Sequence, residues 1–240
     1  IGGDEFVLLH KVTSETSTAR AALRLSDSLQ TPILIKGYEH SVGVSIGSSA
    51  SPENGDSAEQ LLQYADIAMY HAKVSKNIYS VYTHELGVKS RRELNIARGL
   101  EKAAHNNQFH LVYQPKVDIK TGHAVGAEAL LRWSEPVLGD VSPAEFIPIA
   151  ERCGLMCAIG LWVIKQACCQ LNAWEVSGFL FPGRLSINLS IQQVEHPDFY
   201  EQLVTTVEGE GISPYQIELE VTESVLIKHP EKTSGILASL

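Results

Sequence analysis

Acidic and amide side chains recur on one face of three strands that we predict in the second half of the chain. The strands cover residues 125–133, 185–190 and 217–222. Glu128, Asn188 and Glu220 lie on the face of these strands that is opposite the aliphatic side chains. Strands of parallel sheets are ordinarily apolar on both faces, so a polar face needs an explanation.

The pattern alone leaves two explanations of these polar faces open. In one, the strands are half exposed and their polar faces meet water. In the other, the faces converge at the mouth of a barrel, where unpaired carboxylates are costly and a cation would neutralise Glu128 and Glu220. Two carboxylates and the amide of Asn188 form an all-oxygen ligand set, which suits Mg²⁺ or Mn²⁺ better than zinc. The carboxyl ends of barrel strands are also where active sites lie.

Strands and helices alternate from residue 109 onward. We predict strands at 110–114, 125–133, 184–190 and 216–223, and helices at 142–153, 155–178, 197–210 and from 230. Ser142, Pro143 and Glu145 form a strong helix start, with an N-cap, a first-turn proline and a capping box. This alternation predicts an α/β fold with a parallel sheet, either an open doubly wound sheet or a (β/α)₈ barrel.

Residues 1–83 have a different organisation, that of α+β material. We predict strands at 5–12, 33–36, 41–48 and 79–82, and helices at 14–30 and from 57 onward. The second of these helices starts with the capping-box pattern of Ser57 and Gln60. Residues 84–107 are predicted to form a connecting helix that packs through a stripe of apolar residues, namely Leu94, Ala97, Leu100 and Ala104.

Composition limits the partners and the compartment. The net charge of −9 argues against binding to a nucleic-acid polymer or to an anionic membrane surface. The longest apolar run, 154–164, is too short to span a bilayer, so we expect no membrane contact within this segment. The four cysteines lack zinc spacing and are expected to be inert, reduced thiols of a cytoplasmic segment: Cys153, Cys157, Cys168 and Cys169. Residues before Ile1 could still anchor the parent protein in a membrane.

Three motifs in the first part resemble the GGDEF family of diguanylate cyclases. They are Gly2-Gly3-Asp4-Glu5-Phe6, Ser45-Ile46-Gly47 and the ADIAMYHAK helix at 65–73. The resemblance implies the C-terminal part of a nucleotide-cyclase-like α+β domain at residues 1–83. Gly2 and Gly3 would let a turn approach GTP, Asp4 would bind a metal ion and Lys73 would contact phosphates. Without the later motifs, Gly2-Gly3 would indicate only a hairpin turn.

Residues 108–240 resemble the EAL family of phosphodiesterases. The motifs occur in the family's order: Tyr113-Gln114-Pro115, EALLRW at 128–133, SPAEFIPIAE at 142–151, SINLS at 186–190 and ELEVTE at 218–223. The resemblance implies the N-terminal half of a TIM-like barrel that binds cyclic-di-GMP. It implies that Glu128, Asn188 and Glu220 are metal ligands. It also implies that Glu223 braces the adjoining catalytic loop. The residues that would contact the ligand are Gln114, Leu130 and Arg132.

Together, these resemblances imply a GGDEF–EAL protein that turns over cyclic-di-GMP. Its chief activity would be Mg²⁺- or Mn²⁺-dependent hydrolysis of cyclic-di-GMP to pGpG, with the GGDEF part acting as a cyclase or a regulator. Two alternatives remain: an inactive receptor that binds cyclic-di-GMP or GTP, and a protein that acts mainly as a cyclase. The expected partners are cyclic-di-GMP, GTP at the GGDEF part and a second copy in a homodimer. Further catalytic groups of both families would lie before Ile1 and after Leu240, so we expect these 240 residues to be inactive alone.

Overall fold

A computed structural model describes residues 3–11, 17–29 and 31–221 of this mixed α/β chain. The chain divides into two compact units, residues 1–92 and 93–240. Within the described ranges, no helix is both long enough and apolar enough to cross a membrane.

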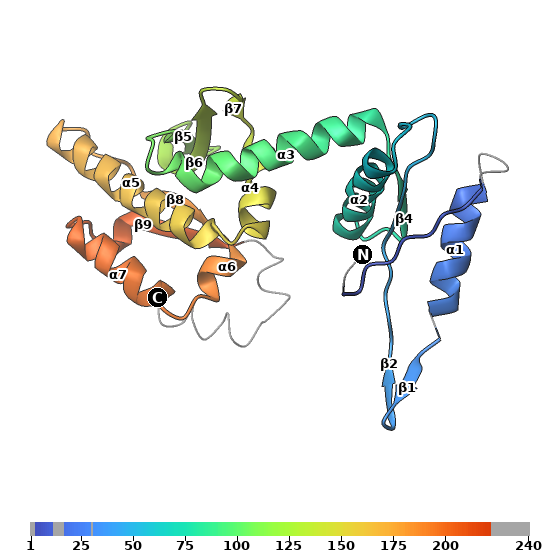
Figure 1. The fold of residues 1–240 in the computed structure, drawn as a ribbon. Coiled ribbons are helices and arrows are strands. Elements are labelled where there is room, and N and C mark those ends of the chain that lie inside the picture. The colour runs from blue at the N-terminus through green and yellow to red at the C-terminus, as the bar shows by residue number, and fades with distance from the viewer. Residues whose placement is uncertain (1–2, 12–16, 30, 222–240) are drawn as a thin grey trace. The chain divides into compact units, whose positions relative to one another are not determined.

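The described part of the first unit contains short strands, two helices and the beginning of a third helix (Figure 1). After helix α1 (Ser17–Leu29), strands β1 (Ile33–Ile35) and β2 (Tyr38–His40) form an antiparallel hairpin. Strands β3 (Ile46–Ser48) and β4 (Tyr79–Val81) pair in parallel, and helix α2 (Ala58–Val74) lies between them in sequence and packs on both. This crossover brings the ADIAMYHAK segment against the strand that contains Gly47.

Local chemistry explains where α2 starts and why it fits so closely. The Ser57 hydroxyl accepts a hydrogen bond of 3.2 Å from the Gln60 backbone N–H, which confirms the predicted N-cap. Ala68 and Ala72 of α2 are fully buried. On β3, a Cβ atom at Gly47 would overlap the α2 backbone at Ala65 and Met69. Glycine is therefore the residue that allows the strand and the helix to touch here.

Two predictions in this unit are wrong. We expected a strand over 5–12, but of its described part, 5–11, only Glu5 forms a bridge; the side chains of Phe6 and Leu9 are more than 90% exposed. Strands need a partner for their backbone groups, and apolar composition does not supply one. We also expected one strand over 41–48. The hairpin instead turns at Lys36 and Gly37, which both have positive φ, and only 46–48 forms a strand, whose partner is β4.

A five-stranded sheet forms the centre of the second unit. Strand β5 (Phe109–Val117) pairs with β6 (Ala124–Glu135), β6 with β8 (Arg184–Leu189) and β8 with β9 (Ile217–Val221); β7 (Gly139–Val141) pairs with the end of β6. The pairs β6–β8 and β8–β9 are parallel, as predicted, whereas β5 and β6 are antiparallel. No closed barrel is formed by the part of the chain that the structure describes.

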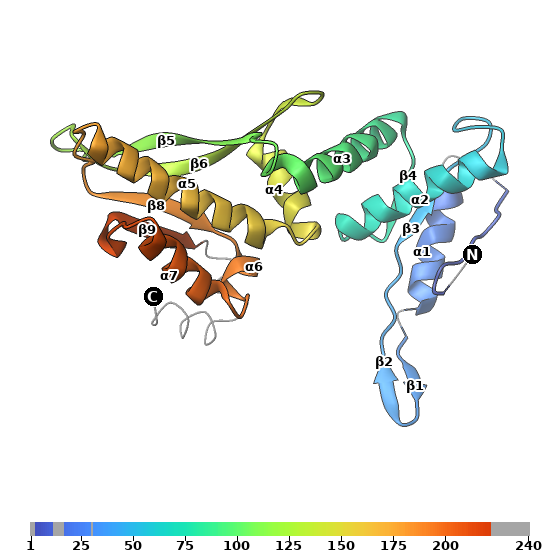
Figure 2. The same cartoon turned by 60° about the vertical axis from the view of Figure 1, so that its left-hand side comes forward.

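Helices cover the apolar face of this sheet (Figures 1 and 2). Helix α3 (His84–Ala103) leads into β5, α4 (Pro143–Arg152) contacts β6, and α5 (Met156–Val176) contacts β5 and β8. The short helix α6 (Ile191–Val194) and helix α7 (Phe199–Gly209) pack against α5, and a 3₁₀ turn (Pro214–Gln216) leads into β9. Fully buried side chains between these layers include Ile96, Trp133, Phe146, Ile164, Leu185 and Ile187.

Details of three helices differ from the sequence expectations. In α3, Leu100 is buried as predicted but Leu94 is half exposed, and Ile96 takes its place in the core. The Ser142 side chain at the start of α4 makes no capping hydrogen bond, so the predicted capping box is absent there. Helix α6 was not predicted; its capping box is formed by Ser190 and Gln193. Gly154, with φ +69°, follows α4 where we predicted its end.

Candidate functional site

The polar face of the sheet is built by four strands whose registers align their side chains. Gln114 of β5 lies opposite Glu128 of β6, and Glu128 lies opposite Ser186 of β8. In the next pair of strands, Asn188 of β8 lies opposite Glu220 of β9. Because side chains alternate along a strand, these residues share one face, while the apolar side chains between them face the helices.

The first predicted pair of site residues is in direct contact. The Asn188 side chain donates a hydrogen bond of 2.6 Å from Nδ2 to Oε1 of Glu128. Glu128 is half buried and Asn188 is exposed, so the contact lies at an accessible edge of the face. Asn188 thus lies between the two acidic residues, touching one and standing in register with the other.

The second acidic residue is held by a lysine that our sequence analysis did not single out. Nζ of Lys116 on β5 donates to Oε1 of Glu220 at 2.5 Å and to Oε1 of Glu218 at 2.9 Å. The same ammonium group contacts Oγ of Ser186, which in turn donates to Glu218 at 2.9 Å. Lys116 therefore connects the first strand of the sheet with the last.

These contacts shift the pKa values of two of the groups. The hydrogen bonds that the Lys116 ammonium donates to Glu220 and then to Glu218 raise its pKa. Hydrogen bonds from Lys116 and then Ser186 lower the pKa of Glu218. Both side chains are more than a third exposed, so water screens the attraction and we assign it little net stability.

A signal for the missed residues was present in the sequence. Lys116 is two positions after Gln114 and therefore lies on the same face of its strand. Glu218 is two positions before Glu220 and shares the face of Glu220 for the same reason. Ser186 has the same relation to Asn188. That Lys116 reaches across to β8 and β9, 70 and more residues later, requires the strand order, which the pattern does not give.

Other predicted ligand contacts of the EAL part lie on or near this face. Gln114 is exposed and Leu130 is half buried. Arg132 is half buried, and its guanidinium donates to the Leu131 carbonyl at 2.9 Å. Glu223 and the helix predicted from residue 230 lie outside the described residues. The functional roles of all these residues stay predictions.

The predicted nucleotide contacts of the first unit lie in two separate elements. Gly3, with φ +57°, and Asp4 form an exposed turn, and Lys73 is exposed in the last turn of α2. Gly2 lies outside the described residues. The positive φ of Gly3 is a conformation that glycine adopts without a steric penalty, in keeping with the predicted turn.

The donor set on the polar face fits a hard divalent cation. Among the described residues no three His, Cys, Asp or Glu side chains gather as a metal site, and the predicted set has only two carboxylates, Glu128 and Glu220, completed by Asn188. Carboxylate and amide oxygens are ligands that Mg²⁺ and Mn²⁺ accept. In this structure, N–H donors of the chain itself satisfy both carboxylates, from Asn188 for Glu128 and from Lys116 for Glu220.

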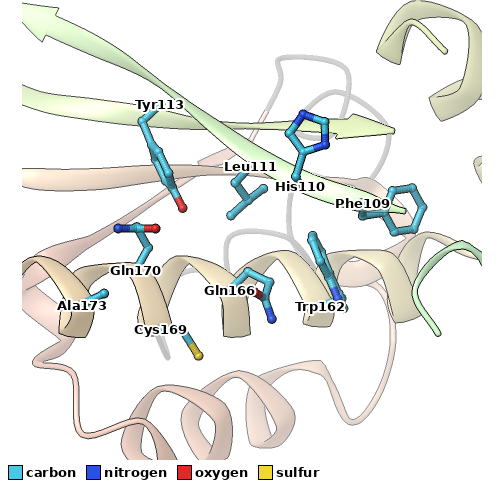
Figure 3. Close-up of a pocket in the computed structure, with 9 residues that line it drawn as sticks. All are labelled: Phe109, His110, Leu111, Tyr113, Trp162, Gln166, Cys169, Gln170 and Ala173. Atoms are coloured by element: carbon cyan, nitrogen blue, oxygen red, sulfur yellow. The ribbon is translucent and has the colours of Figure 1, made fainter. Parts of the chain in front are cut away.

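A pocket of about 430 Å³ lies on the other side of the sheet, between β5 and α5 (Figure 3). Its lining is mainly aromatic, aliphatic and amide side chains, with Tyr113 above Gln170 and with Trp162 and Cys169 on α5. Its lining residues include no carboxylate, lysine or arginine, and the titratable ones among them are His110, Tyr113 and Cys169. We therefore locate the candidate site on the polar face and not in this pocket.

The cysteines are free thiols, as predicted. Burial raises the pKa of Cys168 to about 11 and also raises the pKa values of Cys157 and Cys169. A raised pKa keeps these groups as thiols, which are poor nucleophiles.

Parallel strands with helices on one face and polar side chains on the other are the arrangement in which α/β barrels carry their active sites. Comparison with known families makes this specific: the EAL domain model matches residues 97–240, and the model of the diguanylate cyclase GGDEF domain matches residues 1–77. The chain belongs to the EAL family, with the C-terminal part of a GGDEF domain before the EAL segment.

Relatives confirm this arrangement over the whole chain. The bifunctional diguanylate cyclase/cyclic di-GMP phosphodiesterase MucR of Pseudomonas aeruginosa is 34% identical over 100% of this chain and 35% of its own length. A cyclic di-GMP phosphodiesterase of the same organism is 34% identical over 99% of this chain and 40% of its own length. The chain thus spans well under half of these relatives.

Solved structures of EAL proteins share the fold of part of this chain. The MucR phosphodiesterase in complex with c-di-GMP superposes with a TM-score of 0.57 at 34% identity, covering 60% of this chain and 58% of that chain. The EAL enzyme Bd1971, bound to cAMP and cyclic-di-GMP, gives a TM-score of 0.54 at 28% identity, covering 77% and 48%. The family is one of cyclic-di-GMP metabolism, and these two neighbours bind the dinucleotide.

Proposed function

We propose that the EAL segment belongs to a phosphodiesterase that hydrolyses cyclic-di-GMP to pGpG with Mg²⁺ or Mn²⁺ held by Glu128, Asn188 and Glu220. The observation that carries this proposal is the 2.6 Å contact between Asn188 and Glu128 together with the register of Asn188 and Glu220. Two carboxylates and an amide on adjacent parallel strands provide the oxygen ligands, and the phosphodiesterase relatives support the choice of substrate.

The chain's own residues have distinct tasks in this proposal. Arg132 would hold a phosphate oxygen through a charge-assisted hydrogen bond. Gln114 would be a neutral donor to the ligand, and Leu130 would be a further ligand contact. The bound cation would supply Lewis acidity at the phosphoryl group. Glu223, which lies outside the described residues, would brace the adjoining catalytic loop.

The GGDEF segment has a separate role. We assign GTP contact to Gly2, Gly3 and Lys73 and metal binding to Asp4, as part of a diguanylate cyclase or of a regulatory domain that has kept the fold. We place this segment at 1–83 and join it through a connecting helix, 84–107, to the EAL segment at 108–240.

The test is a pair of substitutions in the full-length protein. Glu128→Ala should abolish the release of pGpG from cyclic-di-GMP in the presence of Mn²⁺, while any synthesis from GTP continues, because Glu128 belongs to the EAL segment. Glu175→Ala, at an exposed position of α5, is the matched control and should leave hydrolysis unchanged.

Each other outcome has a definite meaning. Hydrolysis that survives Glu128→Ala at the wild-type rate would remove Glu128 from the ligand set and refute the proposal. A wild-type protein that binds cyclic-di-GMP without releasing pGpG would identify a receptor instead.

A further inference from the structure

The ammonium group of Lys116 contacts both acidic side chains of β9, those of Glu218 and Glu220. Lys116 extends from β5, yet its ammonium lies at Glu218 and Glu220 of β9, with β6 and β8 between the two strands. The residue opposite Lys116 on β6 is Gly126. Glycine at this position allows β6 to approach β8 closely, because an added Cβ at Gly126 would lie 2.6 Å from the backbone carbonyl oxygen of Arg184.

The ammonium group is fully used in this arrangement. It has three N–H donors, and it meets three acceptors: Ser186, Glu218 and Glu220. Ser186 is fully buried, and its hydroxyl passes a hydrogen bond on to Glu218. Lys116, Ser186 and Glu218 therefore form a triangle of mutual hydrogen bonds. Glu220 joins this triangle only through its hydrogen bond from Lys116.

The charges explain why a cation is needed there. Glu218 and Glu220 are two residues apart on one strand and so point to the same side of the sheet, with their Cα atoms about 7 Å apart along the strand. Two carboxylates so placed repel each other, and Lys116 lies between them. All three side chains are partly exposed, so the ion pairs are weak. A divalent cation can therefore replace Lys116 at one of the two carboxylates.

We infer that Lys116 is a tethered counter-ion that competes with the divalent cation for Glu220 and keeps Glu218 out of the ligand set. This inference rests on the proposed function, because it takes Glu220 as a metal ligand. When the divalent cation binds, Lys116 gives up Glu220 and retains Glu218 and Ser186. Lys116 is thus a positioning residue that sets the apparent metal affinity of the site.

The experiment measures Mn²⁺ binding to the full-length protein without nucleotide, from the electron paramagnetic resonance signal of free Mn²⁺. The site is defined as the Mn²⁺ that the wild type binds and the Glu220→Gln variant does not. Lys116→Met should bind this Mn²⁺ roughly five- to tenfold more tightly than the wild type, because one competing positive charge is gone. Lys116→Arg keeps the charge and should stay close to the wild type.

Two further variants separate competition from loss of structure. Lys116→Gln removes the charge while keeping a polar side chain, and it should also tighten Mn²⁺ binding. Lys120→Met removes an exposed lysine from the loop that follows β5 and should change nothing. In EDTA, Lys116→Met should melt close to Lys120→Met, because the screened pairing contributes little to stability; tighter Mn²⁺ binding then cannot come from a change in folding.

The outcomes distinguish this inference from the proposed function. Equal or weaker Mn²⁺ binding by both Lys116→Met and Lys116→Gln would overturn the inference alone. If Glu220→Gln binds Mn²⁺ like the wild type, no cation binds at Glu220, and the inference fails together with the ligand set. If Lys116→Met tightens binding but Glu128→Ala has no effect on it, the inference stands and the proposed ligand set is wrong.

Discussion

The amide of Asn188 donates a 2.6 Å hydrogen bond to the Glu128 carboxylate across the parallel strands β6 and β8. The contact is diagonal, because the register partner of Glu128 is Ser186, two residues before Asn188. The Asn188 amide, which also carries an oxygen that can bind a metal ion, contacts the predicted ligand Glu128. Asn188 is also in register with the other acidic ligand, Glu220. Asn188 is therefore the residue on which the geometry of the candidate site depends.

Replacing Asn188 by alanine should weaken Mn²⁺ binding by about tenfold or more, since one oxygen ligand and the group that orients Glu128 are both lost. Isothermal titration of the full-length protein with Mn²⁺ measures this directly. Asn106→Ala, at an exposed amide after α3, is the matched control and should bind Mn²⁺ like the wild type. An unchanged affinity in Asn188→Ala would exclude Asn188 from the ligand set.

Gly160→Ala in α5 should destabilise the protein although alanine is the better helix former. An added Cβ would overlap the side chain of Gln193, which is 2% exposed. Gln193 has little freedom to move because it caps Ser190 at the end of β8. Overpacking of this kind typically costs about 1–3 kcal/mol, which denaturant unfolding can resolve.

Gly209→Ala is the matched control, since Gly209 lies in α7 with no atom near the added Cβ. It should leave the free energy of unfolding unchanged or slightly higher. If Gly160→Ala proved as stable as Gly209→Ala, the packing of α6 against α5 would be looser than the structure indicates.

Gly47→Ala should disrupt the first unit, because its Cβ would overlap the backbone of α2, which cannot move as a side chain can. We expect a loss of several kcal/mol or a failure of α2 to pack. Gly43→Ala, four residues earlier, meets no atom within 4 Å and should be tolerated. Circular dichroism and thermal melting of the two variants compare them; equal melting temperatures would contradict the close packing of β3 and α2.

Sequence alone predicted the strands that carry the candidate site. Alternation of apolar and polar residues identified the polar faces of β6, β8 and β9, because a strand places alternate side chains on opposite faces. The alternation of strands with helices along the chain predicted the parallel pairing of these strands. The N-cap at Ser57 and the end of α4 before Gly154 were also predicted, since both depend on neighbours within a few residues.

Features that depend on distant residues could not be predicted in the same way. The antiparallel direction of β5 leaves no trace in the apolar pattern of Phe109–Val117. The network of Lys116 joins residues 70 to 104 positions apart. Residues 6–11 have the composition of a strand, but forming one requires a pairing strand that the described part of the chain does not supply.

Tyr113 provides a test of the packing between β5 and α5 through its titration. Burial, and then the charge of Cys169, raises the pKa of the Tyr113 hydroxyl to about 12. Its ring packs edge-on against Trp174, with centroids 4.9 Å apart, and its hydroxyl points toward Gln170 (Figure 3). The ionised form is thus disfavoured in the folded protein relative to the unfolded chain.

The sign of the effect follows from linkage. Because the folded pKa is raised, the contribution of Tyr113 to stability is complete below pH 10 and is lost as the pH rises toward 12. In a titration followed by absorbance at 295 nm, Tyr113→Phe should remove a component centred near pH 12 from the folded protein. Tyr215→Phe, at an 82% exposed position, controls for the removal of one hydroxyl. A component lost near pH 10 in Tyr113→Phe would mean that Tyr113 is open to water and that α5 does not cover β5.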